Sequence, residues 1–211
     1  MRLPVGVPVR VIAIDGPVGS GKSTVARAVA ARLGLECLET GAMYRAVAAA
    51  VVRRAEADAD PGPAAIALVA GVEIEMGGGR VVVDGDDVTD EIRRPEVGRM
   101  VSKVAALPEV RDRLVAIQRR WVEDRGGAVV EGRDIGSVVF PDAELKVFLT
   151  ATPEERARRR DDEDADDVRR RDRIDSTRAV SPLVVPDGAV VIDSTGRSVD
   201  EVVDEIVGLL L

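Results

Sequence analysis

Short apolar runs alternate with longer amphipathic stretches along most of this 211-residue chain. The runs are rich in valine and isoleucine, which is typical of strands buried on both faces of a parallel sheet. Each follows or precedes a stretch with the length and spacing of a helix. We expect strands over residues 9–14, 35–38, 128–130, 145–149 and 189–192.

Helices are predicted over residues 23–34, 42–55, 108–125, 153–160 and 198–210. The last two are expected to begin with capping boxes, Thr152 with Glu155 and Ser198 with Glu201, in which each side chain binds the other residue's backbone N–H. Strands that alternate with helices predict an α/β fold with a mainly parallel sheet covered on both faces.

Two stretches depart from this alternation. Residues 72–90 alternate apolar and polar side chains around glycine turns, which predicts a β-hairpin or a small antiparallel sheet inserted into the α/β fold. Residues 156–173 are dense in charges of both signs, which indicates a solvated helix or a mobile flap.

Composition removes several kinds of chemistry. The chain has no histidine and one cysteine, Cys37, so a histidine-dependent triad, a zinc site built on His and Cys and an internal disulfide are excluded. Cys37 is expected to be a small apolar filler of the second strand. A net charge of −8 argues against a nucleic-acid polymer as the main partner. No apolar run could span a membrane and the N-terminus lacks a secretion signal, so we expect a cytoplasmic protein.

A phosphate-binding loop follows the first predicted strand. Gly16 to Ser23 fit the pattern G-x-x-x-x-G-K-[ST], in which backbone N–H groups and the N-terminus of the next helix surround an anion. Lys22 is expected to reach the β- and γ-phosphates of ATP, and Ser23 to bind Mg²⁺. The predicted ATP-binding residues are Gly16, Pro17, Val18, Gly19, Ser20, Gly21, Lys22, Ser23 and Thr24.

Three further segments place arginine beside carboxylates or hydroxyls, at residues 39–45, 131–136 and 171–178. Arginine binds phosphate oxygens in pairs, and carboxylates accept hydrogen bonds from amines and sugar hydroxyls. The first two segments follow predicted strands, where ligands of open α/β sheets bind. A second, phosphate-bearing substrate is therefore expected beside the loop.

With these segments the chain resembles the bacterial cytidylate kinases, almost from end to end. The resemblance rests on I-D-G-P at 14–17, G-A-M-Y-R at 41–45, V-A-A-L-P-E-V-R at 104–111, G-R-D-I-G at 132–136 with V-V-F-P-D-A at 138–143, R-D-x-x-D-S-x-R at 171–178 with P-L at 182–183, and V-I-D-S-T at 191–195. Glu39-Thr40 stands where the family commonly has Asp-Ser, a replacement that keeps a carboxylate and a hydroxyl.

The resemblance implies a three-layer P-loop kinase with a five-stranded parallel sheet, an inserted antiparallel β lobe and a helical lid. It implies transfer of the γ-phosphoryl group of ATP to CMP or dCMP, with Mg²⁺. The core would comprise residues 1–38, 111–155 and 176–211, the CMP-binding lobe 39–110 with its β insert at 72–90, and the lid 156–175. Absence of a heptad or a long apolar surface favours a monomer.

Site residues follow from the same resemblance, position by position. Ser102, Arg111, Asp134 and Arg178 would surround the cytosine, with Asp134 facing its exocyclic amine and Arg111 its O2 and N3. Arg171 and Asp175 would hold the sugar hydroxyls. The α-phosphate of CMP would lie near Thr40, Tyr44, Arg45 and Arg133. Lys22, Arg133, Arg156 and Arg160 would be catalytic, the last two acting from the lid on the ATP phosphates.

Several alternatives stay open at this point. Asp134 could simply neutralise Arg133, Tyr44 could be a core residue, and Ser102 a plain helix residue. Trp121 is expected to pack rather than to recognise a ligand. The phosphate-facing arginine of the lid could be Arg156, Arg158, Arg159 or Arg160.

Two other functions compete. One is a kinase of another small acceptor, such as UMP, AMP or shikimate. The other is a P-loop nucleotide-binding module without transferase activity.

Overall fold

The computed structural model describes residues 10–54, 61–159, 165–177 and 181–210. The chain divides into two compact units. Unit 1 comprises Met1–Glu39 and Gln118–Leu211, and unit 2 comprises Thr40–Ile117.

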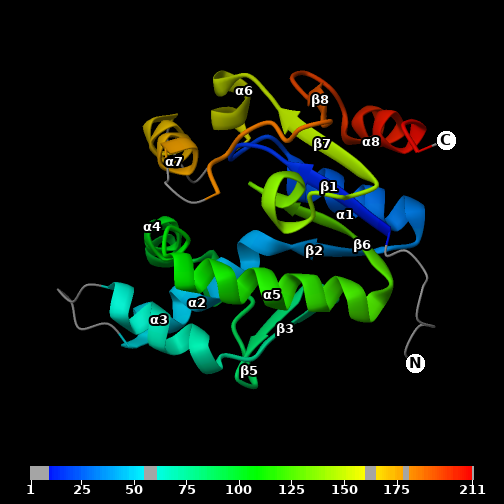
Figure 1. Ribbon diagram of the computed structural model, residues 1–211. Coiled ribbons are helices and arrows are strands. Elements are labelled where there is room, and N and C mark those ends of the chain that lie inside the picture. Colours follow the sequence, from blue (N-terminus) through cyan, green and yellow to red (C-terminus); the bar gives the residue numbers. More distant parts are fainter. Residues whose placement is uncertain (1–9, 55–60, 160–164, 178–180, 211) are drawn as a thin grey trace. The chain divides into compact units, whose positions relative to one another are not determined.

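Unit 1 is built on a parallel sheet with the strand order β2-β6-β1-β7-β8 (Figure 1). All six residues of β6 and the last five of β1 are buried, because the two strands lie in the middle of the sheet and helices cover it. This burial explains the continuous apolar runs. The strands are β1 (Arg10–Asp15), β2 (Glu36–Glu39), β6 (Gly127–Gly132), β7 (Leu145–Thr150) and β8 (Val190–Asp193).

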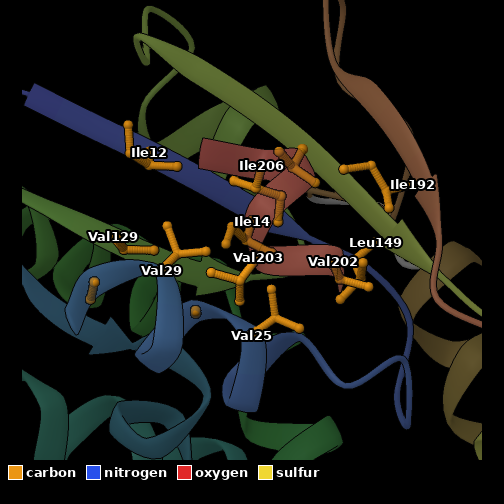
Figure 2. Close-up of a cluster of buried hydrophobic side chains, with 13 residues drawn as sticks. Ile12, Ile14, Val25, Val29, Val129, Leu149, Ile192, Val202, Val203 and Ile206 are labelled. Carbon is orange, nitrogen blue, oxygen red and sulfur yellow. The ribbon is translucent and has the colours of Figure 1, made fainter. Parts of the chain in front are cut away.

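The helices α1 and α8 pack against each other and enclose a hydrophobic core of unit 1. Figure 2 shows Val25 and Val29 of α1 meeting Val203 and Ile206 of α8 over the strand residue Ile14. The helices of unit 1 are α1 (Lys22–Leu33), α6 (Pro153–Arg158), α7 (Ala165–Thr177) and α8 (Val199–Gly208), with a π-helical turn η2 (Ile135–Val139) after β6 and the C-terminal part of α5 (Pro108–Arg125).

Unit 2 combines helices with a small antiparallel sheet in the order β3-β4-β5. Ile74 pairs with Val83, and glycine-containing turns join the strands. The elements are α2 (Thr40–Arg54), α3 (Pro61–Gly71), β3 (Ile74–Gly77), β4 (Arg80–Val83), β5 (Asp86–Asp87), the 3₁₀ turn η1 (Glu91–Arg93), α4 (Pro95–Val104) and the first part of α5.

The predicted fold class is confirmed: a five-stranded parallel sheet with helices, a small antiparallel sheet and helices at the predicted lid. Two helices, α3 and α4, were not predicted. Helix α3 begins Pro-Gly-Pro and ends at a glycine, residues that are typical of loops. Burial of Ala65, Leu68 and Val69 nevertheless stabilises it as a helix. The second begins directly at a proline, which suits the first turn of a helix.

The two predicted capping boxes have different outcomes. At Ser198 both reciprocal hydrogen bonds with Glu201 are present. At Thr152 only the hydroxyl acts as a cap, by accepting from the N–H of Glu155. The Glu155 carboxylate instead accepts from the guanidinium groups of Arg158 and Arg159, so this box was predicted wrongly in its second half. The helix also ends at Arg158, earlier than predicted.

Within the described ranges, the structure contains no helix that combines the length and the apolar character needed to cross a bilayer.

Ile206 provides a test of the core between α8 and the sheet. Because Ile206 is fully buried, we expect Ile206→Ala to lower the free energy of unfolding by about 2–5 kcal/mol through lost burial and a cavity. Val199→Ala, on the same helix at a position that is 40% exposed, should change it by about 0.5 kcal/mol or less. Urea unfolding of both variants measures the difference, and equal effects would contradict the assignment of this core.

Candidate active site

The phosphate loop, residues 16–21, joins β1 to α1 at the carboxyl edge of the sheet, beside the central strands. A Cβ atom on Gly16 would lie 2.1 Å from the carbonyl oxygen of Leu149, and one on Gly19 would lie 2.7 Å from that of Arg156. Only glycine fits at these two positions. The loop is therefore packed directly against β7 and α6.

Lys22 is the first residue of α1, and its side chain turns back along the loop. Its Nζ donates to the carbonyl oxygen of Pro17 at 3.1 Å, and the residue is 6% exposed. Burial lowers the pKa of Lys22 to about 7; the nearby Arg133 guanidinium lowers it further, and the carboxylates of Glu131 and Asp175 oppose the shift. A poorly hydrated ammonium in this place gains more from an approaching phosphate than one in water.

Ser23 and Glu131 form a pair of oxygen donors next to Lys22. The Ser23 hydroxyl donates to Glu131 Oε1 at 3.0 Å, and Glu131 is buried near the end of β6. Hard oxygen donors of this kind suit Mg²⁺, which takes one or two protein ligands and completes its shell with water and phosphate oxygens. Among the described residues no group of three or more acidic, Cys or His side chains could form a metal cage.

Arg133 follows β6 and pairs with α7, a helix of the predicted lid. Its Nε donates to Asp175 Oδ2 at 2.8 Å, and the guanidinium also donates to the carbonyl oxygen of Gly132 at 3.3 Å. The pKa of Arg133 is raised despite its burial, because Asp175 and Glu131 stabilise the charged form. The carboxylate seen paired with Arg133 is thus Asp175, the residue predicted to hold sugar hydroxyls.

Two buried carboxylates, Asp15 and Asp134, lie near each other, and Asp134 follows Arg133 in the chain. Asp15 is the last residue of β1, and its two oxygens accept from the N–H groups of Ile135 and Gly136, each at 2.7 Å. Burial raises the pKa of Asp15 to about 6, partly offset by these two hydrogen bonds. Asp134 is 5% exposed and precedes the π-helical turn η2.

Arg156 links α6 to the loop and to α7. Its Nη1 donates to the carbonyl oxygen of Val18 at 3.1 Å and to Asp172 Oδ2 at 2.5 Å. Its Nε donates to the carbonyl oxygen of Ala151 at 3.2 Å. The residue is buried. Arg156, which begins the predicted lid, thus touches the phosphate loop, and its contact with ATP stays a prediction.

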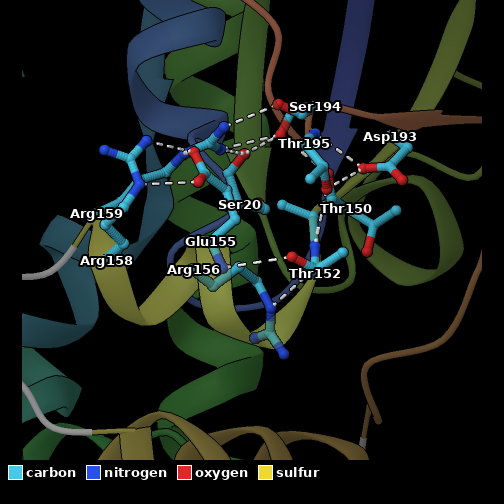
Figure 3. Close-up of polar contacts among 11 residues, drawn as sticks. Ser20, Thr150, Thr152, Glu155, Arg156, Arg158, Arg159, Asp193, Ser194 and Thr195 are labelled. Atoms are coloured by element: carbon cyan, nitrogen blue, oxygen red, sulfur yellow. Dashed lines mark hydrogen bonds and ion pairs between the residues drawn. The ribbon is translucent and has the colours of Figure 1, made fainter.

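Arg159 makes a second contact with the loop (Figure 3). Its Nη1 donates to the carbonyl oxygen of Ser20 at 3.2 Å and to Ser194 Oγ at 3.0 Å, while Nη2 donates to the Ser194 carbonyl oxygen at 2.8 Å. Ser194 Oγ itself lies 2.9 Å from the carbonyl oxygen of Thr150. Arg158 points elsewhere, with a side chain 75% exposed. Of the three candidates within the described residues, Arg156, Arg158 and Arg159, the first and the last reach the loop.

The predicted acceptor residues of unit 2 lie on α2, α4 and α5, and two of them, Tyr44 and Arg111, are in contact. The Arg111 guanidinium lies 5.5 Å from the centre of the Tyr44 ring and donates to the carbonyl oxygen of Ala105 at 3.2 Å. Arg45 donates to the carbonyl oxygen of Ile92 at 3.1 Å. Tyr44 is 8% exposed, so the alternative that it belongs to the core of unit 2 is compatible with its burial.

Of five other predicted residues, the structure describes two in full and the other three in part or not at all. Thr40 is buried at the start of α2, and Ser102 is half-buried on α4. The backbone of Arg171 belongs to α7, but its side chain is outside the described structure, as are Arg160 and Arg178 entirely. Their predicted roles remain untested.

Sequence reasoning assigned no role to Asp15, Glu131 or Ser194, which are all buried polar residues at or just after strand ends. A signal existed, because a polar residue at the carboxyl end of a buried parallel strand lies where such sheets bind ligands. It was too general to single out these three.

Lys22 can be tested by Lys22→Met, which keeps length and removes charge. We expect ATP-dependent phosphoryl transfer to fall about 100-fold or more, the loss of roughly 3 kcal/mol of transition-state stabilisation.

Unfolding measured without nucleotide, as a function of pH, tests the burial of the Lys22 ammonium. With its pKa lowered to about 7, native Lys22 binds fewer protons than unfolded lysine between about pH 7 and 10, so wild-type stability should rise relative to the variant across that window. Parallel stability curves would contradict a buried ammonium.

Arg159 and Arg158 form a matched pair, since both donate to Glu155 and only Arg159 reaches the loop. Arg159→Ala should lower kcat/KM for ATP by roughly tenfold or more, the effect of losing a charged hydrogen-bond donor. Arg158→Ala should stay within about twofold of wild type, because surface ion pairs contribute little. Steady-state kinetics with ATP varied decides, and equal effects would contradict a distinct role for Arg159.

Comparison with known proteins identifies the family. A sequence model described as "Cytidylate kinase" matches residues 12–210. A curated cytidylate kinase of Pelotomaculum thermopropionicum is 50% identical over 212 residues, with 93% of each chain covered. That of Mycobacterium leprae is 49% identical, with 95% of each chain covered. Shikimate kinase from Acinetobacter baumannii superposes with a TM-score of 0.52 at 13% identity, covering 97% of this chain and 94% of the other, and shows a shared fold alone. The chain belongs to the cytidylate kinase family.

Proposed function

We propose that this protein transfers the γ-phosphoryl group of ATP to CMP or dCMP, forming ADP and CDP or dCDP. One observation carries the proposal: in a chain of this family, the phosphate loop and the Arg133-Asp134 segment leave neighbouring strands at the same edge of the parallel sheet. An oxygen of the CMP phosphate forms the new bond to the γ-phosphorus. The bond from that phosphorus to the β,γ-bridging oxygen breaks, and ADP carries away the electron pair.

The chain's own residues act by position and charge. Lys22 is proposed to neutralise charge on the β- and γ-phosphates, and Arg133 to bridge the acceptor phosphate and the phosphoryl group in transfer. The phosphate of CMP is already an anion, so the absence of histidine is no obstacle. Arg156 and Arg159 would hold α6 over the loop, excluding water that would otherwise hydrolyse ATP.

Mg²⁺ fits the same site. The Ser23 hydroxyl and the Glu131 carboxylate are the two oxygen donors that would hold it. The ion would neutralise phosphate charge and align the β- and γ-phosphates. Ser23 was expected as a ligand from the sequence, and Glu131 is added on its geometry.

We also propose the acceptor roles that the family resemblance implies. In unit 2 these belong to Thr40, Tyr44, Arg45, Ser102 and Arg111, and after α6 in the chain to Arg171, Asp175 and Arg178. The division into a core, a CMP-binding lobe and a lid, a monomeric state, a cytoplasmic location and the absence of a nucleic-acid partner are proposals in the same sense. Among the alternative acceptors, shikimate is not supported by the structural similarity to shikimate kinase, because that similarity concerns the fold alone. The shared name of the curated relatives favours CMP.

The acceptor is tested by ADP release with ATP and each nucleoside monophosphate or shikimate. We expect CMP and dCMP to give the highest kcat/KM. Asp134→Ala should lower kcat/KM for CMP by about 10- to 100-fold, through loss of one charged hydrogen bond to the amine, and leave KM for ATP within about twofold. Equal losses for both substrates would make Asp134 a structural residue. Turnover of shikimate without turnover of CMP would refute the function.

A further inference from the structure

The turn that carries Arg133 and Asp134 is capped by a residue outside it. An aspartate that precedes a helix ordinarily accepts a hydrogen bond from that helix's first N–H groups. Asp134 occupies this position before η2, but its side chain makes no such capping hydrogen bond. The N–H groups of Ile135 and Gly136 donate instead to Asp15, one to each carboxylate oxygen, at 2.7 Å.

Asp15 lies at the junction of two functional segments. It is the last residue of β1 and directly precedes Gly16 of the phosphate loop. The parallel register places it opposite Gly132, the residue before Arg133. One side chain thus joins the start of the ATP-binding loop to the start of the proposed acceptor-binding turn. Two short charge-assisted bonds restrain the turn in direction as well as in distance.

Burying the Asp15 carboxylate carries a desolvation penalty, which indicates that the residue does more than stabilise the fold. Asp15 is 1% exposed, and burial disfavours its charged form. The negative charge of Asp134 adds to the penalty, while Lys22 relieves part of it. A buried carboxylate is a weak source of folding free energy when desolvation opposes it. Its two hydrogen bonds do, however, fix the backbone immediately after Asp134.

We propose that Asp15 is a positioning residue for acceptor recognition, which caps the turn after Asp134 from the end of β1 and thereby sets the selectivity for cytosine over uracil. The proposal rests on the proposed function, because Asp134 is taken to accept from the exocyclic amine of cytosine. Uracil has a carbonyl oxygen in place of that amine. A displaced Asp134 therefore loses an interaction with CMP that UMP never had.

The test is the ratio of kcat/KM for CMP to kcat/KM for UMP, measured on one preparation. Any loss of folded enzyme cancels in this ratio, so a merely structural role would leave it unchanged. Asp15→Asn is nearly isosteric, but its amide offers one acceptor oxygen and turns an N–H₂ group towards the second backbone donor. We expect the ratio to fall about tenfold or more, with KM for ATP within about twofold of wild type.

Three further variants sharpen the result. Ile206→Ala destabilises unit 1 from the α8 side of the core and should keep the wild-type ratio. Asp15→Asn added to Asp134→Ala should lower the ratio no further than Asp134→Ala alone, because Asp15 acts through Asp134. Asp15→Glu, which keeps the charge but moves both oxygens, should also lower the ratio and replaces Asp15→Asn if that variant does not fold.

The outcomes separate the two proposals. A wild-type enzyme that does not turn over CMP would refute the proposed function, and one that uses CMP and UMP equally would refute both the recognition of the cytosine amine by Asp134 and the role of Asp15. A selective wild type, together with an Asp15→Asn or Asp15→Glu variant of unchanged ratio, would overturn the role of Asp15 and leave the function intact. Additive losses in the double variant would overturn the route through Asp134.

Discussion

The parallel pairing of β1 with β6 is the contact on which the candidate active site of unit 1 depends. The register sets Ile14 opposite Glu131 and Asp15 opposite Gly132, so both strands end at the same edge. The phosphate loop leaves one strand and the Arg133-Asp134 segment leaves the other. Because both strands are buried, these segments start from a rigid frame, and the charged groups that follow are held without much solvent.

Charge in this site is balanced over several partners. Lys22 and Arg133 lie near Glu131 and Asp175, and each carboxylate stabilises the positive charges that burial opposes. Arginine suits this arrangement because its fork can serve a carboxylate and a carbonyl oxygen together. Arg156 does so with Asp172 and the loop. The same forks match phosphate oxygens, which is why a nucleotide kinase can build its frame and its binding groups from one residue type.

The sequence predicted what depends on local pattern. The five strands, the phosphate loop and the antiparallel insert follow from apolar runs and glycine placement, and all are found. Helix α3 was missed because its prolines and glycines are typical of a loop. The burial of Leu68 and its neighbours, which stabilises the helix, depends on tertiary packing. The pairing of Arg133 with Asp175 and the contact of Arg159 with Ser194 join residues far apart in the chain. No local pattern encodes such pairs, since they form only once the fold has brought the helices α6 and α7 to the ends of the strands.

We propose that the edge formed by β1 and β6 binds both substrates. The most direct measurement is a crystal structure of the protein with ADP and CMP. We expect the β-phosphate of ADP within hydrogen-bond distance of Lys22 Nζ, the CMP phosphate beside Arg133, and the cytosine amine within hydrogen-bond distance of Asp134. A CMP molecule bound away from Arg133 and Asp134 would contradict it.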